Sequence, residues 1–151
     1  MNVKIDVAEC WIDVLEAQQW LSGDTASGAI VTFIGQVRNH NLDDTVTALT
    51  LEHYPAMTQR TLSDIADQAN ERWTLGRIYI YHRVGRLEPG EPIVFVGVSS
   101  AHRDASFEAA RFIMDILKTS APFWKKEQTA HGERWLDARA SDERAAHAWS
   151  D

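Results

Sequence analysis

The lysines of this chain are concentrated in one short segment. Three of the four lysines, Lys118, Lys125 and Lys126, lie within nine consecutive residues of a 151-residue chain whose formal net charge is −7. Lysine is the basic residue whose pKa shifts readily and whose amine can act as acid, base or nucleophile. The cluster therefore indicates a candidate site for acid–base or nucleophilic chemistry. A solvated turn with no chemical role is the alternative.

Further basic groups lie where an anion can bind. His102 and Arg103 follow an apolar strand pattern and directly precede a helical one. A helix start has free backbone N–H groups and the positive end of the peptide dipoles, so these side chains suit a phosphate or a carboxylate there. Arg38 likewise ends a strand pattern, just before the polar run 39–44. For each of these residues, a surface position without a ligand is the alternative.

Local periodicity limits which lysines can share a site. Lys118 lies at the end of a predicted helix, and Lys125 and Lys126 lie in a strand predicted over 123–128. Side chains alternate between the faces of a strand, so only one of these two neighbours can easily face the pocket that Lys118 faces. Lys125 shares its face with Phe123 and Glu127, and Lys126 shares the other face with Trp124. If both are instead exposed charges on a strand edge, they serve to discourage aggregation.

Composition argues against several classes of protein. The acidic balance disfavours a general binder of nucleic acid or of anionic membranes. Cys10 is the sole cysteine, which suits a reducing, cytoplasmic compartment. The histidines and Cys10 show no metal-ligand spacing, and there is no phosphate-loop or G-x-S-x-G pattern, so neither a metal nor a cofactor is expected. No signal-peptide pattern is found, and the longest apolar run, 93–98, is too short to span a bilayer.

The apolar pattern predicts strands mixed with helices. Strands are expected over 3–7, 29–37, 46–53, 77–84, 92–99, 123–128 and 134–137. Helices are expected over 10–21, 55–73, 104–117 and 141–149. We expect segment 29–37 to be mostly buried, with Gly35 at a bulge, Asp104 to cap its helix and His82 to be a packed histidine. The whole indicates an α+β fold in one domain, 1–151, with a mostly antiparallel or mixed sheet and two long helices.

Several ordered motifs resemble one family, the large, catalytic subunits of molybdopterin synthase. The resemblance covers about Gly28 to Trp149, and the first 27 residues add little to it. The motifs are F-I-G-Q-V-R-N-H-N at 33–41, L-T-L-E-H-Y-P-A-M at 49–57, H-R-V-G at 82–85, V-F-V-G-V-S-S-A-H-R at 94–103 and F-I-M-D-I-L-K-T-S-A-P-F-W-K-K-E at 112–127. Their common order and spacing make the likeness specific, which none of them would be alone.

The resemblance implies a sulfur transfer. In this family a small ubiquitin-like subunit inserts a C-terminal Gly-Gly thiocarboxylate into the large subunit, and two sulfurs pass in turn to cyclic pyranopterin monophosphate, giving molybdopterin. The family's fold is an α/β hammerhead, and two large subunits form a central homodimer with a small subunit at each outer end. A scaffold that only holds the ubiquitin-like tail, or another enzyme that handles phosphate esters, remains the alternative.

The resemblance also implies the residues of the pocket. Lys118 is expected to donate a proton or to stabilise charge, and Lys125 to contact the thiocarboxylate and to be a candidate acceptor of the acyl group. Arg139 is expected to enter from the neighbouring large subunit. The remaining expected substrate-binding residues are Phe33, Arg38, His102, Arg103, Met114 and Glu127.

Overall fold

A mixed four-stranded sheet forms the centre of the larger part of the molecule. The computed structural model describes residues 2–136 and 140–150. The first strand runs parallel to its neighbour, and the other two pairings are antiparallel. In spatial order the strands are β1 (Val3–Ala8), β5 (Ile78–Arg83), β7 (Pro92–Ser100) and β2 (Ala29–Gln36).

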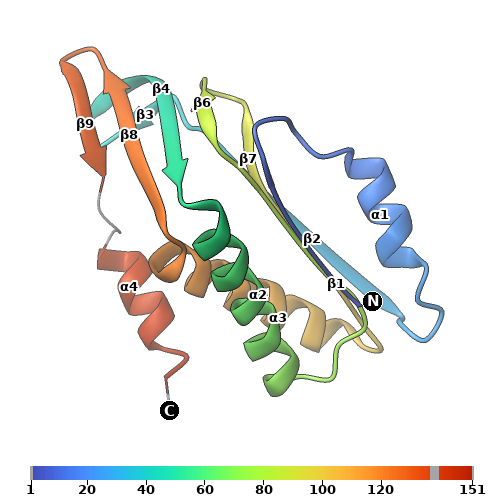
Figure 1. Cartoon of the computed structure of the whole chain (residues 1–151). Helices are drawn as coiled ribbons and strands as arrows, with labels where there is room; N and C mark the ends of the chain where they lie inside the picture. Colours follow the sequence, from blue (N-terminus) through green and yellow to red (C-terminus); the bar gives the residue numbers. More distant parts are fainter. Residues whose placement is uncertain (1, 137–139, 151) are drawn as a thin grey trace.

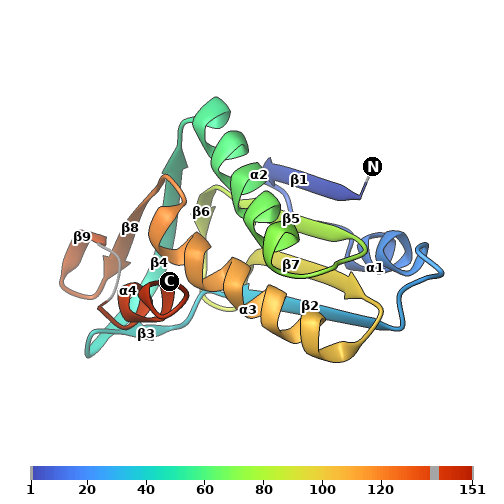
Figure 2. The same ribbon diagram turned by 90° about the horizontal axis from the view of Figure 1, so that it is seen from below.

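Helices cover both faces of this sheet (Figure 1). The two long helices, α2 (Pro55–Arg72) and α3 (Arg103–Ser120), lie side by side on one face, as Figure 2 also shows. Their buried side chains, such as Leu62 and Ile113, pack with the strand residues beneath them in the main core. The short helix α1 (Val14–Ser22) covers the opposite face and packs against its aromatic side chains.

A second sheet stands beside the first and carries the lysine segment. Its long strands, β4 (Asp44–His53) and β8 (Phe123–Thr129), are antiparallel, and β9 (Gly132–Leu136) pairs with the outer side of β8. The short strands β3 (His40–Asn41) and β6 (Gly85–Leu87) both pair with β4. The last helix, α4 (Ala140–His147), lies against α3 below this sheet (Figure 1).

The α+β class, the mixed sheet and the two long helices agree with the sequence prediction. The bulge is also confirmed, because the register of β2 against β7 shifts between Gly35 and Gln36. The expectation that 29–37 is mostly buried is wrong. β2 is the last strand of its sheet in the described structure, so side chains such as Ile30 and Ile34 remain about 40% exposed.

Two helix starts also differ from the prediction. α1 begins at Val14 rather than at residue 10, because the Asp13 carboxylate accepts a hydrogen bond from the backbone N–H of Glu16 at 3.1 Å. Asp104 is not a cap. His102 occupies that position without a side-chain hydrogen bond, and Asp104 lies inside the first turn, where its charge favours the helix dipole.

Candidate active site

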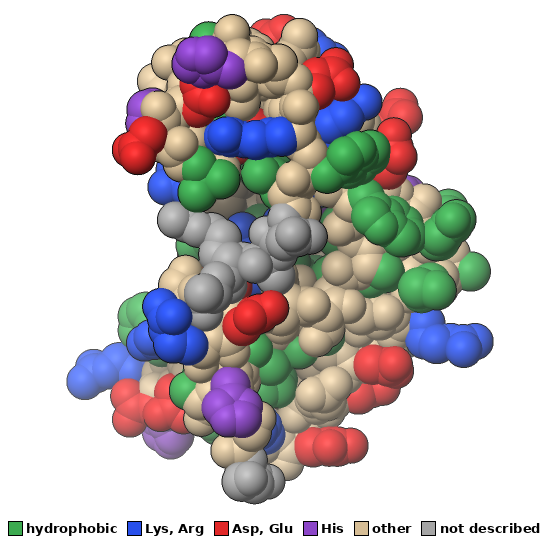
Figure 3. All heavy atoms as spheres, turned by 90° about the vertical axis from the view of Figure 1, so that its left-hand side faces the viewer, with side chains coloured by type: hydrophobic (Ala, Val, Ile, Leu, Met, Phe, Trp, Pro, Cys, Tyr) green, Lys and Arg blue, Asp and Glu red, His purple; other side chains and the backbone are tan. Residues whose placement is uncertain are grey.

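A cavity of about 920 Å³ opens where the second sheet meets the end of α3. Figure 3 looks onto the side of β9 and α4, with the β8–β9 hairpin at the top and the helical part below. The second sheet supplies much of its wall, and the ends of strands of the first sheet, the end of α3 and the start of α4 also contribute. Six of the expected site residues line it: Phe33, Arg38, Met114, Lys118, Lys125 and Glu127.

Two of the three clustered lysines converge on this cavity. Lys118 lies in the last turn of α3, and Lys125 lies on β8 with its side chain partly buried. Burial, and then the positive charge of Lys118, lower the pKa of Lys125 from 10.5 to about 8, and the negative charge of Asp142 on α4 opposes this effect. About a tenth of the Lys125 side chains are then neutral amines at pH 7. Lys125 can therefore act as a cation or, in that fraction, as a nucleophile.

Lys126 lies on the other face of β8, as the alternation predicted. Its Nζ is 3.6 Å from a carboxylate oxygen of Glu133 and 5.5 Å from the ring centre of Trp135. Lys126 is not among the residues that line the cavity, although its neighbour Trp124 reaches the rim. The lysine segment is therefore divided between a cavity face and a surface face.

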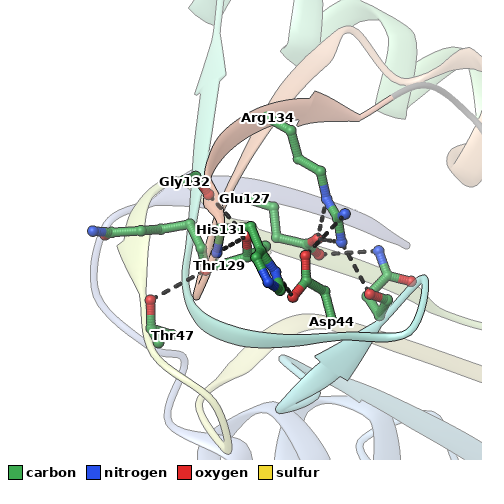
Figure 4. Close-up of polar contacts among 9 residues, drawn as sticks. Asp44, Thr47, Glu127, Thr129, His131, Gly132 and Arg134 are labelled. Carbon is green, nitrogen blue, oxygen red and sulfur yellow. Dashed lines mark hydrogen bonds and ion pairs between the residues drawn. The ribbon is translucent and has the colours of Figure 1, made fainter.

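Glu127 lines the cavity, but its carboxylate is already occupied (Figure 4). Oε1 accepts hydrogen bonds from Nε and Nη2 of Arg134 at 2.9 and 2.6 Å, and Oε2 accepts one from Asn41 Nδ2 at 3.0 Å. The same guanidinium donates to the carbonyl oxygen of Asn41 and pairs with Asp44 at 3.5 Å. This network joins β8 and β9 to the β3–β4 hairpin, which begins at His40, two residues after Arg38.

The hairpin itself is a tight turn between β3 and β4. Leu42 and Asp43 have φ values of 51° and 62°, the left-handed region that two-residue hairpin turns require. Asp44 follows directly and accepts a hydrogen bond from the His131 ring at 2.7 Å (Figure 4). That bond lowers the pKa of the Asp44 carboxyl. The loop that carries Arg38 into the cavity wall is thus anchored by its own turn and by the network around Glu127.

The remaining expected site residues are not brought into this cavity by the described chain. His102 and Arg103 are exposed at the start of α3, whereas Lys118 is in its last turn. An 18-residue helix is about 27 Å long, so one chain cannot place both ends of α3 around one small ligand. Arg139 lies outside the described residues.

The cavity also contains residues that sequence reasoning did not select. His82, Asn41, Arg134 and Asp142 all line it. The alternation of β9 could have suggested Arg134, and the alternation of β5 shows only that His82 faces inward. No local signal marks Asp142, because its position depends on how α4 lies against α3.

Two further observations concern the whole described chain. Within residues 2–136 and 140–150, no group of three or more histidine, cysteine, aspartate or glutamate residues is placed to hold a metal ion. No helix of the described chain is long and apolar enough to cross a membrane.

Together, the fold and the cavity define an α+β protein with a lysine-bearing pocket suited to an anionic ligand. The family model described as MoaE protein matches residues 7–120, and the chain belongs to this family. The molybdopterin synthase catalytic subunit of Escherichia coli K12 is 57% identical over 148 residues, which are 98% of this chain and 99% of that protein.

Solved structures agree with this assignment. The molybdopterin biosynthesis MoaE protein of Burkholderia ambifaria has a TM-score of 0.84 and 41% identity, covering 99% of each chain. A molybdopterin synthase crystal structure from Staphylococcus aureus has a TM-score of 0.81 and 29% identity, covering 86% of this chain and 94% of that one. The family match begins at residue 7, ahead of the motifs on which the sequence resemblance rests.

Proposed function

We propose that this chain is the catalytic subunit of a molybdopterin synthase. It would convert cyclic pyranopterin monophosphate to molybdopterin with two sulfurs from the C-terminal thiocarboxylate of a small ubiquitin-like subunit. The observation that carries this proposal is the convergence of Lys118 and Lys125 on one cavity, with Lys125 partly buried and its pKa lowered to about 8. The thiocarboxylate is an anion, and a partly desolvated ammonium group is a strong partner for it.

In the proposed reaction, the thiocarboxylate sulfur forms a bond to a carbon of the pterin substrate, and the carbon–oxygen bond at that carbon breaks, with the oxygen leaving as water or staying on the phosphate. The tail is then joined to the substrate as a thioester. Water, or the neutral amine of Lys125, adds to the thioester carbonyl, and the bond between the acyl carbon and sulfur breaks. The sulfur stays on the substrate as a thiolate. The tail leaves as a carboxylate when water adds, and it stays bound to Lys125 as an amide when the amine adds. Lys118 would stabilise the tetrahedral oxyanion or donate a proton to the leaving sulfur.

The phosphate of the substrate needs cationic donors. Arg38 is the expected site arginine that lines the cavity with the lysines in one chain. We place His102, Arg103 and Arg139 in the site only through a second copy, as in the central homodimer expected for this family. Phe33 and Met114 supply apolar cavity wall for the pterin ring. Since the Glu127 carboxylate is bound by Arg134 and Asn41, its proposed contribution is to hold the wall of the site rather than to contact the ligand.

A reconstituted reaction tests this function. The purified chain is mixed with thiocarboxylated small subunit and cyclic pyranopterin monophosphate, and the dithiolene product is measured. Product is expected with the unaltered chain and is expected to fall strongly with Lys118→Ala or Lys125→Ala. Tail binding without any product would favour the scaffold, and release of phosphate without sulfur transfer would favour a phosphate-ester enzyme. The cytoplasmic location and the single-domain organisation over 1–151 remain predictions.

A further inference from the structure

His82 is a buried histidine in the cavity wall to which the proposed reaction assigns no role. It lies on β5, its exposed fraction is 3%, and it is one of the residues that line the cavity. Its ring is stacked on that of Phe123, with centroids 3.9 Å apart and planes 20° from parallel. This stack fixes the plane of the ring.

The hydrogen bond at Nδ1 determines the tautomer of this ring. Nδ1 is 2.7 Å from the backbone carbonyl oxygen of Arg83. A carbonyl oxygen can only accept, so Nδ1 must carry the proton and donate it. In a neutral ring with its proton on Nδ1, Nε2 has no proton and presents a lone pair.

The surroundings keep this ring neutral. Burial, then the positive charges of Lys125 and Lys118 and the nearby His53, lower the pKa of His82 to about 3, against the opposing effect of the Arg83 carbonyl. His82 is thus a very poor base at neutral pH, but it remains a hydrogen-bond acceptor. Its two lysine neighbours can only donate hydrogen bonds when they are protonated, so the Nε2 lone pair supplies the cavity with a hydrogen-bond acceptor.

The Nε2 atom is open to the cavity rather than sealed in the core. Among the described residues, the ring makes its hydrogen bond through Nδ1. In the described residues, every side-chain nitrogen or oxygen that is shielded from solvent has a hydrogen-bond partner. Nε2 must therefore be accessible from the cavity that His82 lines. An oriented acceptor of this kind favours ligands that bring an N–H group to it, because losing such a bond in a buried site is costly.

We propose that Nε2 of His82 is a specificity-determining acceptor for an amide-type N–H group of the ligand. This inference rests on the proposed function for the identity of the ligand. Two sources of the N–H are available there: the peptide groups of the Gly-Gly tail, and the ring N–H groups of the pterin. In either case, His82 orients the ligand so that its reacting atom lies between Lys118 and Lys125.

Histidine ¹⁵N NMR of the unaltered protein tests the proposal without requiring catalysis. In the free protein, Nδ1 should show the protonated shift and Nε2 the unprotonated shift from pH 5 to pH 8. The probes are the small subunit in its unthiolated carboxylate form and cyclic pyranopterin monophosphate, added separately. The Nε2 signal should move toward the protonated direction with the probe that donates the N–H, which distinguishes tail from pterin. A ring protonated at Nε2, or an Nε2 signal that neither probe moves, overturns the proposal.

Two variants provide an independent kinetic test. His82→Phe keeps the stack on Phe123 but removes the acceptor, whereas His82→Gln keeps an acceptor. We expect His82→Phe to raise the KM for the N–H-bearing reactant about 10- to 100-fold with little change in kcat, and His82→Gln to restore part of the loss. His53→Phe, which alters another imidazole near Phe123 outside the cavity wall, is the matched control. Unchanged KM values for both reactants in folded His82→Phe contradict the inference. If the unaltered chain makes no product, the proposed function fails, while the NMR test of His82 remains valid.

Discussion

The electrostatic coupling between the two cavity lysines can be tested by changing Lys118 and measuring Lys125. The difference between the ordinary lysine pKa of 10.5 and about 8 corresponds to about 3 kcal/mol of preference for the neutral amine. Burial is the larger cause and the charge of Lys118 the smaller one. In Lys118→Met the pKa of Lys125 should therefore rise, but only part of the way back to 10.5.

Two further variants test the direction in which the pKa of Lys125 moves. Lys118→Arg retains the positive charge, so the pKa of Lys125 should stay near 8. Asp142→Asn removes the negative charge that opposes the effect, so the pKa should fall further. The measurement is the pH dependence of the ¹³Cε chemical shift of Lys125, assigned with a Lys125→Arg sample. A Lys125 pKa that is unchanged in Lys118→Met, or that returns fully to 10.5, refutes the coupling or the dominance of burial.

Three other predictions follow from the same region. Because the pKa of Lys125 is lowered in the folded chain, the unfolded chain binds more protons at this residue between about pH 8 and 10, and the free energy of unfolding should rise with pH there. Lys125→Met should flatten that rise in denaturant titrations. Above about pH 10, Tyr81 has the opposite effect, because burial raises its pKa to about 12. Lys126→Ala should form product at close to the rate of the unaltered chain, whereas Lys125→Ala should form much less. If both variants fold and lose the same activity, the assignment of the two lysines to opposite faces of β8 is contradicted. Arg134→Met should lower the free energy of unfolding by about 3 kcal/mol in urea titrations, because it leaves the buried Glu127 carboxylate without its ion-pair partner. The double variant with Glu127→Gln should lose less stability than the sum of the two single changes.

Most of the fold could be predicted because its signals are local. Alternation and continuous apolar runs marked seven of the nine strands within the described residues, and the apolar stripe placed both long helices to within a few residues. β3 and β6, of two and three residues, were missed since so short a segment shows no period. The exposed face of β2 was also missed, because an apolar strand looks the same at the edge of a sheet as at its centre.

The candidate site was predicted in part for the same reason. Alternation along β8 correctly separated the two neighbouring lysines, of which Lys125 lines the cavity and Lys126 does not. The family resemblance, rather than local order, put His102, Arg103 and Lys118 in one pocket. These positions lie at opposite ends of α3, so one chain by itself does not bring them together. The engagement of Glu127 by Arg134 depends on the pairing of two strands, and pairing is not a property of either strand alone.

The sequence by itself determined the class of fold, the family resemblance and the division of the lysine segment, since each depends on residue type and on short periodic spacing. Only the tertiary structure decided the environment of those residues. It buried Lys125 beside Lys118, brought Asp142 near them, and held His82 as a neutral Nδ1–H tautomer against Arg83 and Phe123. The physical reason is that desolvation and charge–charge interactions depend on distances between residues far apart in the chain, and these distances exist only once the sheets and helices have packed.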